Sequence, residues 1–291
     1  MRMSRWSMKS TLWTGMLISA ALGSHAAGAA VGMVEQPCEA PLVAPAVFRE
    51  QLTALLIEPH AVTPEQFAAF SNNPQVKEFN EANQKRTAQD WPALCRYREP
   101  NAAVLASHAA PRVVFMGDSI TEFWEVADPA LFDGKLINRG ISGHTTAQML
   151  LRFRADVIAL RPKAVHILGG TNDVAGNGGP TSPQDFRNNI MSMVELAQAN
   201  RVRVILGSIP PAAAFPWRPE VKPAPMIEDL NVWLRKYAAS KGVRFIDYHQ
   251  ALAGADGELK PDLGNDGVHP NRNGYRIMRR LLERELSAAS R

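Results

Sequence analysis

One stretch decides the fold of this chain, and it reads Val113-Val114-Phe115-Met116-Gly117-Asp118-Ser119-Ile120-Thr121. Its first four residues are apolar and include β-branched and aromatic types, which predicts a short buried strand. A glycine then breaks the run, and a serine follows two residues later. Such a turn lifts Ser119 to the carboxyl end of a central strand, which is the edge where open α/β sheets place their ligands.

Downstream of this stretch, short apolar segments alternate with longer segments of helical periodicity. Strands are expected at residues 113–116, 136–138, 164–168, 202–207 and 243–246. Helices are expected at residues 145–160, 183–200, 226–241 and 271–286. Alternating strands and helices with short loops predict a parallel central sheet with helices on both faces, which is a three-layer α/β/α sandwich.

A serine hydroxyl at such an edge is a weak nucleophile until a base removes its proton. Asp266-Gly267-Val268-His269 places a carboxylate three residues before a histidine, which is close enough in a tight turn to orient the ring. Residues 138–145 follow the second strand, and their glycines allow backbone amides to face a ligand. Residues 168–173 follow the third strand and include Asn172, whose side-chain amide suits an oxyanion. A nucleophile, a base and oxyanion donors are therefore expected at one edge of the sheet.

Taken in chain order, these blocks resemble those of the SGNH (GDSL-type) hydrolase family. The matching residues are Gly117-Asp118-Ser119 in the first block, Gly143 in the second, Asn172 in the third, and Asp266 with His269 in the last. The resemblance covers residues 112–286. Residues 145–146 and 170–173 look like those of the platelet-activating-factor acetylhydrolase-like and lysophospholipase-like branch. The resemblance implies the flavodoxin-like SGNH form of the α/β/α sandwich.

The same resemblance implies a serine esterase that uses no metal and no cofactor. Ser119 would attack the ester carbonyl, His269 would take its proton, and Asp266 would hold the imidazole ring. The oxyanion would lie among the backbone amides of Ser119 and Gly143 and the side-chain amide of Asn172. The substrate would be a small-molecule, glycan or lipid ester. A carbohydrate O-acetylesterase and a lipid or aryl esterase both fit, and the acyl length and the oligomeric state stay open.

Several of these residues also allow a purely structural interpretation. Ser119 stands where a helix N-cap is common, Asp118 is expected to be a turn or cap carboxylate, and Asn172 could bridge a turn. For the whole chain, the second hypothesis is a non-catalytic ligand-binding or glycan-binding relative that keeps the pocket. The complete set of five site residues argues against this hypothesis, because a binding module does not need all of them.

The first 26 residues have the three parts of a secretory signal peptide. They contain three basic and no acidic residues, an apolar stretch at residues 12–22, and small residues after it. We expect cleavage after Ala26 or Ala29 and a secreted or periplasmic protein. A membrane anchor is less favoured, because the apolar stretch is shorter than the roughly 20 residues that cross a bilayer.

The formal net charge of +4 comes mostly from this leader, which leaves +1 for the rest of the chain. No later tract combines dense lysine and arginine with aromatic residues, so nucleic acid is not an expected partner. No later stretch is long and apolar enough to predict a transmembrane segment in the mature chain.

Residues 27–108 are expected to form a helical extension, and residues 109–291 the catalytic domain. Apolar side chains recur at helical spacing through the extension, for example at Phe48, Phe70 and Phe79. A further helix is expected around Trp91, Leu94 and Tyr97, before Pro100. Core packing is the commoner role for such aromatic residues, and a partner surface is the alternative.

The chain has two cysteines, Cys38 and Cys95. In an oxidising compartment an even pair is a disulfide candidate, and two unpaired thiols are the alternative. Neither cysteine has a partner at metal-ligand spacing, so no zinc site is expected.

Two further features lie near the expected site. His144 borders the oxyanion loop and is expected to be exposed. Residues 215–219, which read Phe-Pro-Trp-Arg-Pro, interrupt the α/β pattern in a loop that overhangs the site in this fold. Trp217 and Arg218 are therefore candidate substrate contacts, and a rigid proline-rich surface loop is the alternative.

Overall fold

A computed structural model of the chain describes residues 33–288. The expected signal peptide, residues 1–26, lies outside the described residues. The chain divides into two compact units, Met1–Pro37 and Cys38–Arg291. All elements reported below belong to the second unit.

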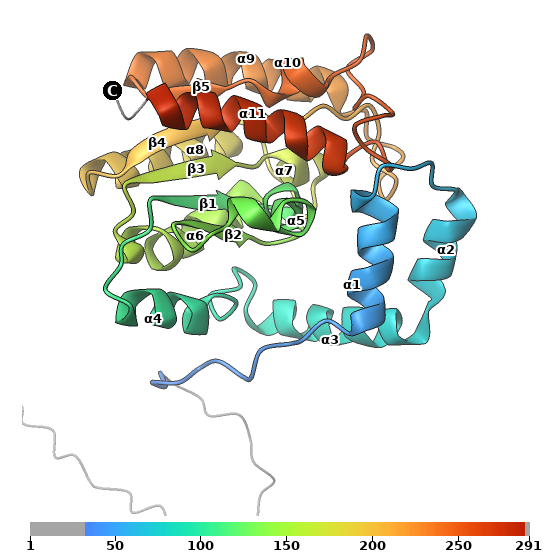
Figure 1. Cartoon of the computed structure of the whole chain (residues 1–291), viewed down its shortest axis with the longest axis horizontal. Coiled ribbons are helices and arrows are strands. Elements are labelled where there is room, and N and C mark those ends of the chain that lie inside the picture. The colour runs from blue at the N-terminus through green and yellow to red at the C-terminus, as the bar shows by residue number, and fades with distance from the viewer. Residues whose placement is uncertain (1–32, 289–291) are drawn as a thin grey trace, which may run out of the picture. The chain divides into compact units, whose positions relative to one another are not determined.

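Five parallel strands form one sheet at the centre of this unit (Figure 1). They are β1 (Val113–Gly117), β2 (Leu136–Gly140), β3 (Ala164–Leu168), β4 (Arg203–Gly207) and β5 (Arg244–Ile246). Their order is β2-β1-β3-β4-β5. Gly117 pairs with Gly140 on one side and with Leu168 on the other, so three strands end at the same level. All five expected strands are confirmed, with bounds that differ by two residues or fewer.

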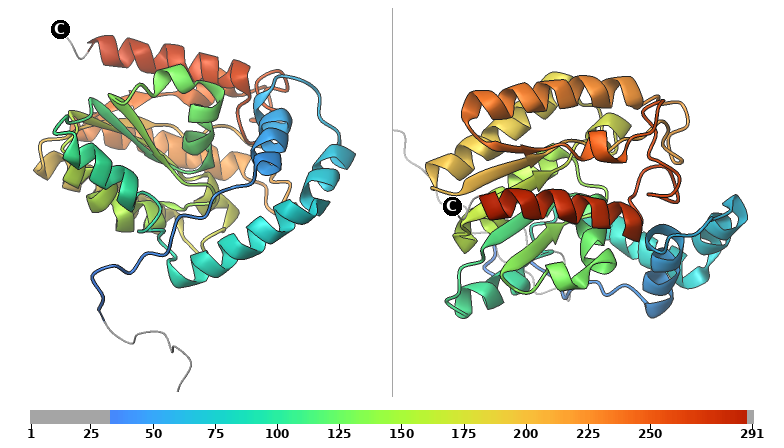
Figure 2. Two further views of the ribbon diagram at one scale, coloured as in Figure 1. Left: turned by 60° about the horizontal axis from the view of Figure 1, so that its bottom comes forward. Right: turned by 45° about the horizontal axis from the view of Figure 1, so that its top comes forward.

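Helices cover both faces of the sheet (Figures 1 and 2). One face packs against α6 (Thr146–Asp156), α8 (Pro183–Ala199) and α9 (Ala224–Lys241), and the other against α5 (Ser119–Ala127), α10 (Tyr248–Leu252) and α11 (Arg272–Ala288). Successive side chains of a strand point to opposite faces. Val114 and Met116 therefore join the first cluster, and Val113 and Phe115 join the second. This is the expected three-layer α/β/α sandwich.

Several short elements were not expected from the sequence, including α5, α7 (Thr171–Ala175), α10 and the 3₁₀ turn η2 (Pro129–Leu131). The helix expected at residues 145–160 is also shorter than predicted. It ends at Asp156, because Val157 leaves helical geometry with φ −124° and ψ −64°. A separate 3₁₀ turn, η3 (Ile158–Leu160), follows.

The segment before the sheet is helical, as expected. It contains α1 (Ala46–Leu52), the π-helical turn η1 (Thr53–Ile57), α2 (Pro64–Asn72), α3 (Pro74–Gln89) and α4 (Arg98–Ala106). The ring of Phe48 contacts those of Phe70 and Phe79, with centroid distances of 5.5 Å and 4.7 Å. These aromatic residues thus pack against one another. No helix within residues 33–288 has the length and apolarity needed to cross a membrane.

The helix expected around Trp91, Leu94 and Tyr97 was wrong. Residues 91–97 form turns, and α4 begins only at Arg98. Ala93 has φ 53°, which interrupts any helix there. Pro100 lies inside α4 rather than after a helix, and proline is tolerated in the first turn because the N–H it lacks has no helical partner there.

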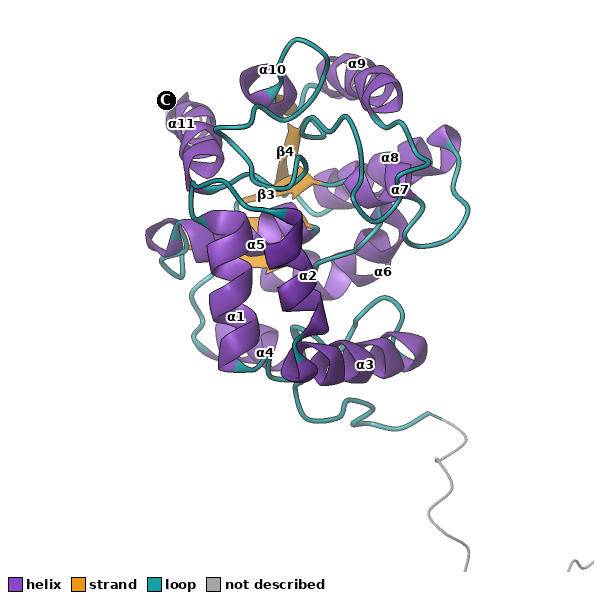
Figure 3. Cartoon of the chain, turned by 90° about the vertical axis from the view of Figure 1, so that its right-hand side faces the viewer, coloured by secondary structure: helices purple, strands orange, loops and turns teal. Residues whose placement is uncertain are grey.

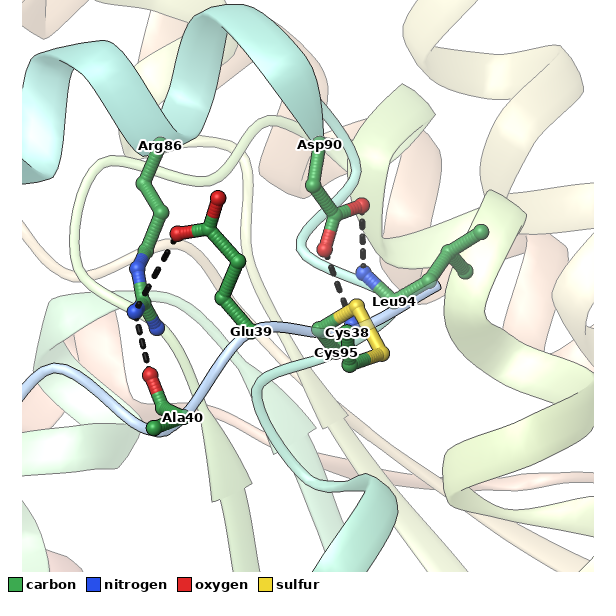
Figure 4. The surroundings of a disulfide bond; sticks show 7 residues. All are labelled: Cys38, Glu39, Ala40, Arg86, Asp90, Leu94 and Cys95. Carbon is green, nitrogen blue, oxygen red and sulfur yellow. Dashed lines mark hydrogen bonds and ion pairs between the residues drawn. A yellow bond between two sulfur atoms is a disulfide. The ribbon is translucent and has the colours of Figure 1, made fainter. Parts of the chain in front are cut away.

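The disulfide between Cys38 and Cys95 is present, with an S–S distance of 2.04 Å (Figure 4). The carboxylate of Asp90 accepts hydrogen bonds from the backbone N–H groups of Leu94 and Cys95, both at 2.8 Å. The side chain of Arg86 reaches the carbonyl of Ala40 beside the disulfide. The disulfide and these contacts tie the start of this unit to the turn that precedes α4.

Candidate active site

Ser119 is the first residue of α5, directly after β1. Gly117 allows this turn, because a Cβ there would lie 2.0 Å from Thr121 Oγ1 and 2.5 Å from the carbonyl oxygen of Leu168. The N-cap is Asp118, whose carboxylate accepts the backbone N–H of Ile120 at 2.9 Å. The cap role expected for Asp118 is therefore confirmed, and the hydroxyl of Ser119 is not used as the cap.

The three residues expected to form a triad are in contact. Ser119 Oγ lies 2.9 Å from His269 Nε2, and His269 Nδ1 lies 2.6 Å from Asp266 Oδ2. Because an ionised carboxylate only accepts hydrogen bonds, Nδ1 is the donor in the second contact. In the neutral ring this leaves Nε2 able to accept the hydroxyl proton of Ser119.

A tight turn brings Asp266 back onto His269. Asp266 Oδ1 accepts the backbone N–H groups of Val268 at 2.9 Å and of His269 at 2.7 Å. Gly267, between them, has φ 77°, a conformation that favours glycine. One carboxylate oxygen therefore fixes the turn while the other holds the ring.

Burial and charge oppose each other in this pair. Burial raises the pKa of Asp266, but the charge of His269 and the hydrogen bonds from His269 and Val268 outweigh it, so that the pKa lies below its ordinary value. Burial lowers the pKa of His269, but the charge and hydrogen bond of Asp266 outweigh it and raise this pKa, with a further contribution from Asp118. Burial raises the pKa of Asp118 itself to about 7.

The expected oxyanion donors lie at the ends of β2 and β3. Gly143 has φ 81°. Its neighbours are engaged, since Ser142 N donates to Glu122 Oε2 and His144 N donates to the carbonyl of Ile141. Within residues 33–288, the backbone N–H of Gly143 meets no acceptor. This amide is therefore available to a ligand.

Asn172 lies in α7, is 4% exposed and belongs to the same site. Its Nδ2 donates to the carbonyl of His144 at 3.1 Å and lies 3.4 Å from Asp118 Oδ2. The amide nitrogen thus points toward the loop that holds Gly143 and toward the turn that holds Ser119. The structure brings together all five residues that the sequence singled out.

The exposure expected for His144 was wrong, since this side chain is 5% exposed. Its Nδ1 accepts a hydrogen bond from Arg152 Nε at 3.2 Å, and burial lowers its pKa to about 3. The ring points inward because the buried side chain of Arg152 donates a hydrogen bond to it there. His144 therefore supports the oxyanion loop from beneath.

Arg152 is a buried residue that the sequence analysis missed. Its guanidinium donates to the carbonyls of Arg139 at 2.7 Å and Gly117 at 2.9 Å, and it forms an ion pair with Asp156 at 3.0 Å. It therefore joins the ends of β1 and β2 beneath the site. The sequence offers only an arginine with a carboxylate four residues later, a spacing that is common for ion pairs on helix surfaces.

The N-terminal helical segment contacts the loop before His269 and the elements on either side of the Gly143 loop. Tyr97 donates its hydroxyl proton to the carbonyl of Gly140, and Gln148 Nε2 donates to the carbonyl of Trp91 at 2.8 Å. Asn265, next to Asp266, donates to the carbonyls of Leu55 and Glu58. Figure 3 views the sheet from the side where its strands end, with α1 and α2 in front of α5.

Two aromatic rings flank His269. The rings of Phe123 and Trp217 lie 5.4 Å and 6.4 Å from it, centroid to centroid. Trp217 is 42% exposed, whereas Phe215, on which it stacks, is fully buried. Arg218 pairs instead with Glu220 at 3.7 Å. Of the two residues expected as substrate contacts, Trp217 is therefore the one in contact with the triad. No cluster of three or more potential metal ligands occurs among the described residues.

Comparison with known proteins places this site in a family. The model of the GDSL-like lipase/acylhydrolase family matches residues 115–277. A structure from Bacteroides fragilis, assigned to the acylhydrolases, is 42% identical, covers 69% of this chain and 99% of its own, and has a TM-score of 0.66. A GDSL-like lipase from Bacteroides thetaiotaomicron is 45% identical, with coverages of 68% and 98% and a TM-score of 0.65.

The lipoprotein YqeF of Bacillus subtilis strain 168 is a curated relative, 39% identical over 74 residues. That match spans 24% of this chain and 30% of the relative. The family match, in contrast, runs from β1 before Ser119 into α11 after His269, so it includes every block on which the resemblance rested. The chain therefore belongs to the GDSL-like lipase/acylhydrolase family.

Proposed function

We propose that this protein is a secreted serine esterase that hydrolyses carboxylic esters with Ser119, His269 and Asp266. The observation that carries the proposal is the continuous line of contacts from Ser119 Oγ to His269 Nε2 at 2.9 Å and from His269 Nδ1 to Asp266 at 2.6 Å. Membership of an acylhydrolase family supports the same chemistry.

In the first half of the reaction, Ser119 Oγ attacks the ester carbonyl carbon as His269 Nε2 takes its proton. The carbonyl oxygen becomes an oxyanion, and Asp266 stabilises the imidazolium that forms. When the tetrahedral intermediate collapses, the bond to the alkoxy oxygen breaks and His269 protonates the leaving alcohol. Water then attacks the acyl-enzyme by the same route and releases the acid.

The negative charge on the oxyanion is stabilised by the backbone amides of Ser119 and Gly143 and by Asn172 Nδ2. The unpaired amide of Gly143 supports this assignment. Donors fixed in place before the reaction need not reorganise as the charge develops, and one such donor is worth about 10²–10³ in kcat.

Export is part of the proposal, and three observations support it. The leader of residues 1–26 has the pattern of a signal peptide, a curated relative is a lipoprotein, and a disulfide suits an oxidising compartment. Mass spectrometry of exported protein should show a mature N-terminus at or near Ala27 or Ala30. An exported product that retains Met1 would contradict this part of the proposal.

The test of the catalytic proposal is the hydrolysis of p-nitrophenyl esters of graded acyl length. Wild-type protein should hydrolyse at least the acetyl ester, and Ser119→Ala should lose nearly all of this activity. Ser240→Ala, which changes an exposed serine at the end of α9, is the matched control and should retain it. Equal rates for wild type and Ser119→Ala would overturn the proposal. The acyl lengths accepted define the substrate class.

A further inference from the structure

A line of three side chains runs from the surface to the oxyanion donor. Trp217 Nε1 donates to Asn177 Oδ1 at 3.0 Å, and Asn177 Nδ2 donates to Asn172 Oδ1 at 2.5 Å. Asn172 Nδ2 in turn donates to the carbonyl of His144 at 3.1 Å. The line therefore begins at an exposed indole and ends at the loop that carries Gly143.

The two ends of this line determine the orientation of both amides between them. An indole N–H only donates and a backbone carbonyl only accepts. Asn177 must therefore turn its oxygen to Trp217 and its nitrogen to Asn172. Asn172 must then receive that donor on its oxygen, so its nitrogen faces the site. If either amide alone were rotated by 180°, each of its two contacts would pair a donor with a donor or an acceptor with an acceptor.

Local structure holds the middle of this line in place. α7 ends at Ala175, and the φ of 69° at Gly176 then reverses the chain. The reversal allows the backbone N–H of Asn177 to donate to the carbonyl of Asn172 at 3.0 Å, which is the pattern of a Schellman helix end. Asn177 is therefore tied to Asn172 through both its backbone and its side chain.

The loop that carries Trp217 is anchored as well. Arg218 N donates to the carbonyl of Phe215 at 2.9 Å, which closes a turn around Trp217. The buried ring of Phe215 stacks under the indole at 5.3 Å. The turn, anchored in the core by Phe215, therefore holds the indole N–H against Asn177.

We propose that Asn177 and Trp217 are positioning residues that keep the amide nitrogen of Asn172 directed at the oxyanion. This inference rests on the proposed esterase function and adds two residues to it. Without the Trp217 N–H, Asn177 is free to rotate and offer its oxygen to Asn172. The orientation of Asn172 that its contacts with His144 and Asp118 favour is then held less firmly, and for part of the time its carbonyl oxygen, which repels negative charge, faces the oxyanion.

Two variants each remove one donor group of this line. Trp217→Phe keeps an aromatic ring but has no donor, and Asn177→Asp keeps the volume but cannot donate to Asn172 when ionised. Losing one hydrogen bond should lower kcat on an acetyl ester by about 3- to 10-fold for Trp217→Phe. The decrease should be larger, about 10- to 100-fold, for Asn177→Asp, because Asn177 is the direct partner of Asn172 and an ionised carboxylate there attracts the Asn172 amide nitrogen away from the oxyanion. KM should change by less than about 2-fold, since the ground-state carbonyl is nearly neutral.

The decisive experiment introduces each substitution into the Asn172→Ala variant and measures the residual hydrolysis. With no amide left to position, neither substitution should lower kcat further. Trp233→Phe is the matched control, because it makes the same substitution in α9, where the Trp233 ring packs against Tyr237 outside this line. It should leave kcat and KM unchanged. Circular dichroism verifies that each variant is folded.

The possible failures are distinguishable. If wild-type protein shows no hydrolysis that depends on Ser119, the esterase proposal fails, and this inference fails with it. If wild-type protein is active but both variants retain its kcat, the positioning role alone is overturned. A rise in KM at unchanged kcat, or an equal loss of kcat in the Asn172→Ala background, would also overturn it, because both indicate a role other than orienting Asn172.

Discussion

The carboxylate of Asp266 holds both the turn at residues 266–269 and the ring of His269. Asp266 uses one oxygen for two backbone N–H groups and the other for the imidazole, so the turn and the ring cannot move independently. A spacing of three residues is enough because Gly267 adopts a positive φ. The arrangement needs no contribution from a distant strand, and for that reason a short motif was sufficient to predict it.

At the residue scale, the first prediction concerns Asn172→Ala. The nucleophile and the base survive this change, but one oxyanion donor is lost. On an activated ester kcat should fall by about 10²–10³, with a much smaller change in KM. Ser119→Ala and His269→Ala should each nearly abolish activity, and their combination should lose little more, because either change disables the same mechanism. A folded Asn172→Ala protein with wild-type kcat would remove this residue from the oxyanion hole.

The second prediction concerns pH. A protonated His269 cannot accept the proton of Ser119, so activity is present above the pKa of His269 and is lost as the pH falls through it. Because Asp266 raises this pKa above the ordinary 6.5, the acidic limb of kcat/KM should lie above pH 6.5.

Asp118 offers a direct check of this assignment. Its charge contributes to the raised pKa of His269, and asparagine caps a helix as well as aspartate does. Asp118→Asn should therefore move the acidic limb to lower pH without unfolding the protein. A limb that moves to higher pH would contradict the assignment.

At the scale of single elements, the oxyanion loop depends on Gly143. An alanine there has open space but must adopt φ 81°, and such strain costs on the order of 1–3 kcal/mol. Gly134→Ala is a matched control, since Gly134 has φ 84° and equally open surroundings in the turn before β2. Both variants should lose similar stability to urea, and only Gly143→Ala should lose kcat. Equal kcat values would contradict the placement of the Gly143 amide at the oxyanion.

The disulfide gives a prediction for the N-terminal segment. It joins residues 57 apart, and closing a loop of that size contributes about 4 kcal/mol in the chain-entropy model. A Cys38→Ser/Cys95→Ser double variant should have a free energy of unfolding lower by about 4 kcal/mol and should therefore unfold at a lower urea concentration. At urea concentrations below the unfolding transition, its kcat should stay near that of wild type. Reductant should destabilise wild-type protein and leave the double variant unchanged. Insensitivity of wild-type stability to reductant would contradict this prediction.

The elements predicted correctly share one property, which is a pattern that burial imposes over several residues. Each strand is a short apolar run because helices cover both faces of the sheet, and α8 and α9 are long enough for periodicity to appear. α7 and α10 have only five residues each. Apolar spacing at residues 91–97 was misread as a helix, because an Asp90 cap and a disulfide hold that segment in turns instead.

At the scale of the whole molecule, the site is assembled from contacts between distant segments. Ser119, Gly143 and Asn172 were predictable because each lies shortly after a strand, and parallel strands end at one edge. Asp266 and His269 were predictable from their own three-residue spacing. The residues that support this site were not predictable. Arg152 reaches the carbonyl of Gly117, 35 residues away, and Asn265 reaches that of Leu55, 210 residues away. Such contacts depend on how elements pack, which no local pattern encodes.

The N-terminal segment therefore contributes to the site as well as to the core. Contacts from residues 55–58 and 91–97 reach the loop before His269 and the ends of the two elements that flank the Gly143 loop, β2 and α6. Its backbone carbonyls accept hydrogen bonds from Asn265 and Gln148, and Tyr97 donates one to Gly140. Contacts from one segment thus link the surroundings of His269 to those of Gly143.

Covalent labelling tests whether Ser119 is a nucleophile that His269 activates. Native protein should be treated with a fluorophosphonate and the modified peptide identified by mass spectrometry. One rapid adduct on Ser119 is expected, which is absent from Ser119→Ala and forms far more slowly in His269→Ala. An adduct on another serine, or no adduct in a protein that still hydrolyses esters, would contradict this role of Ser119.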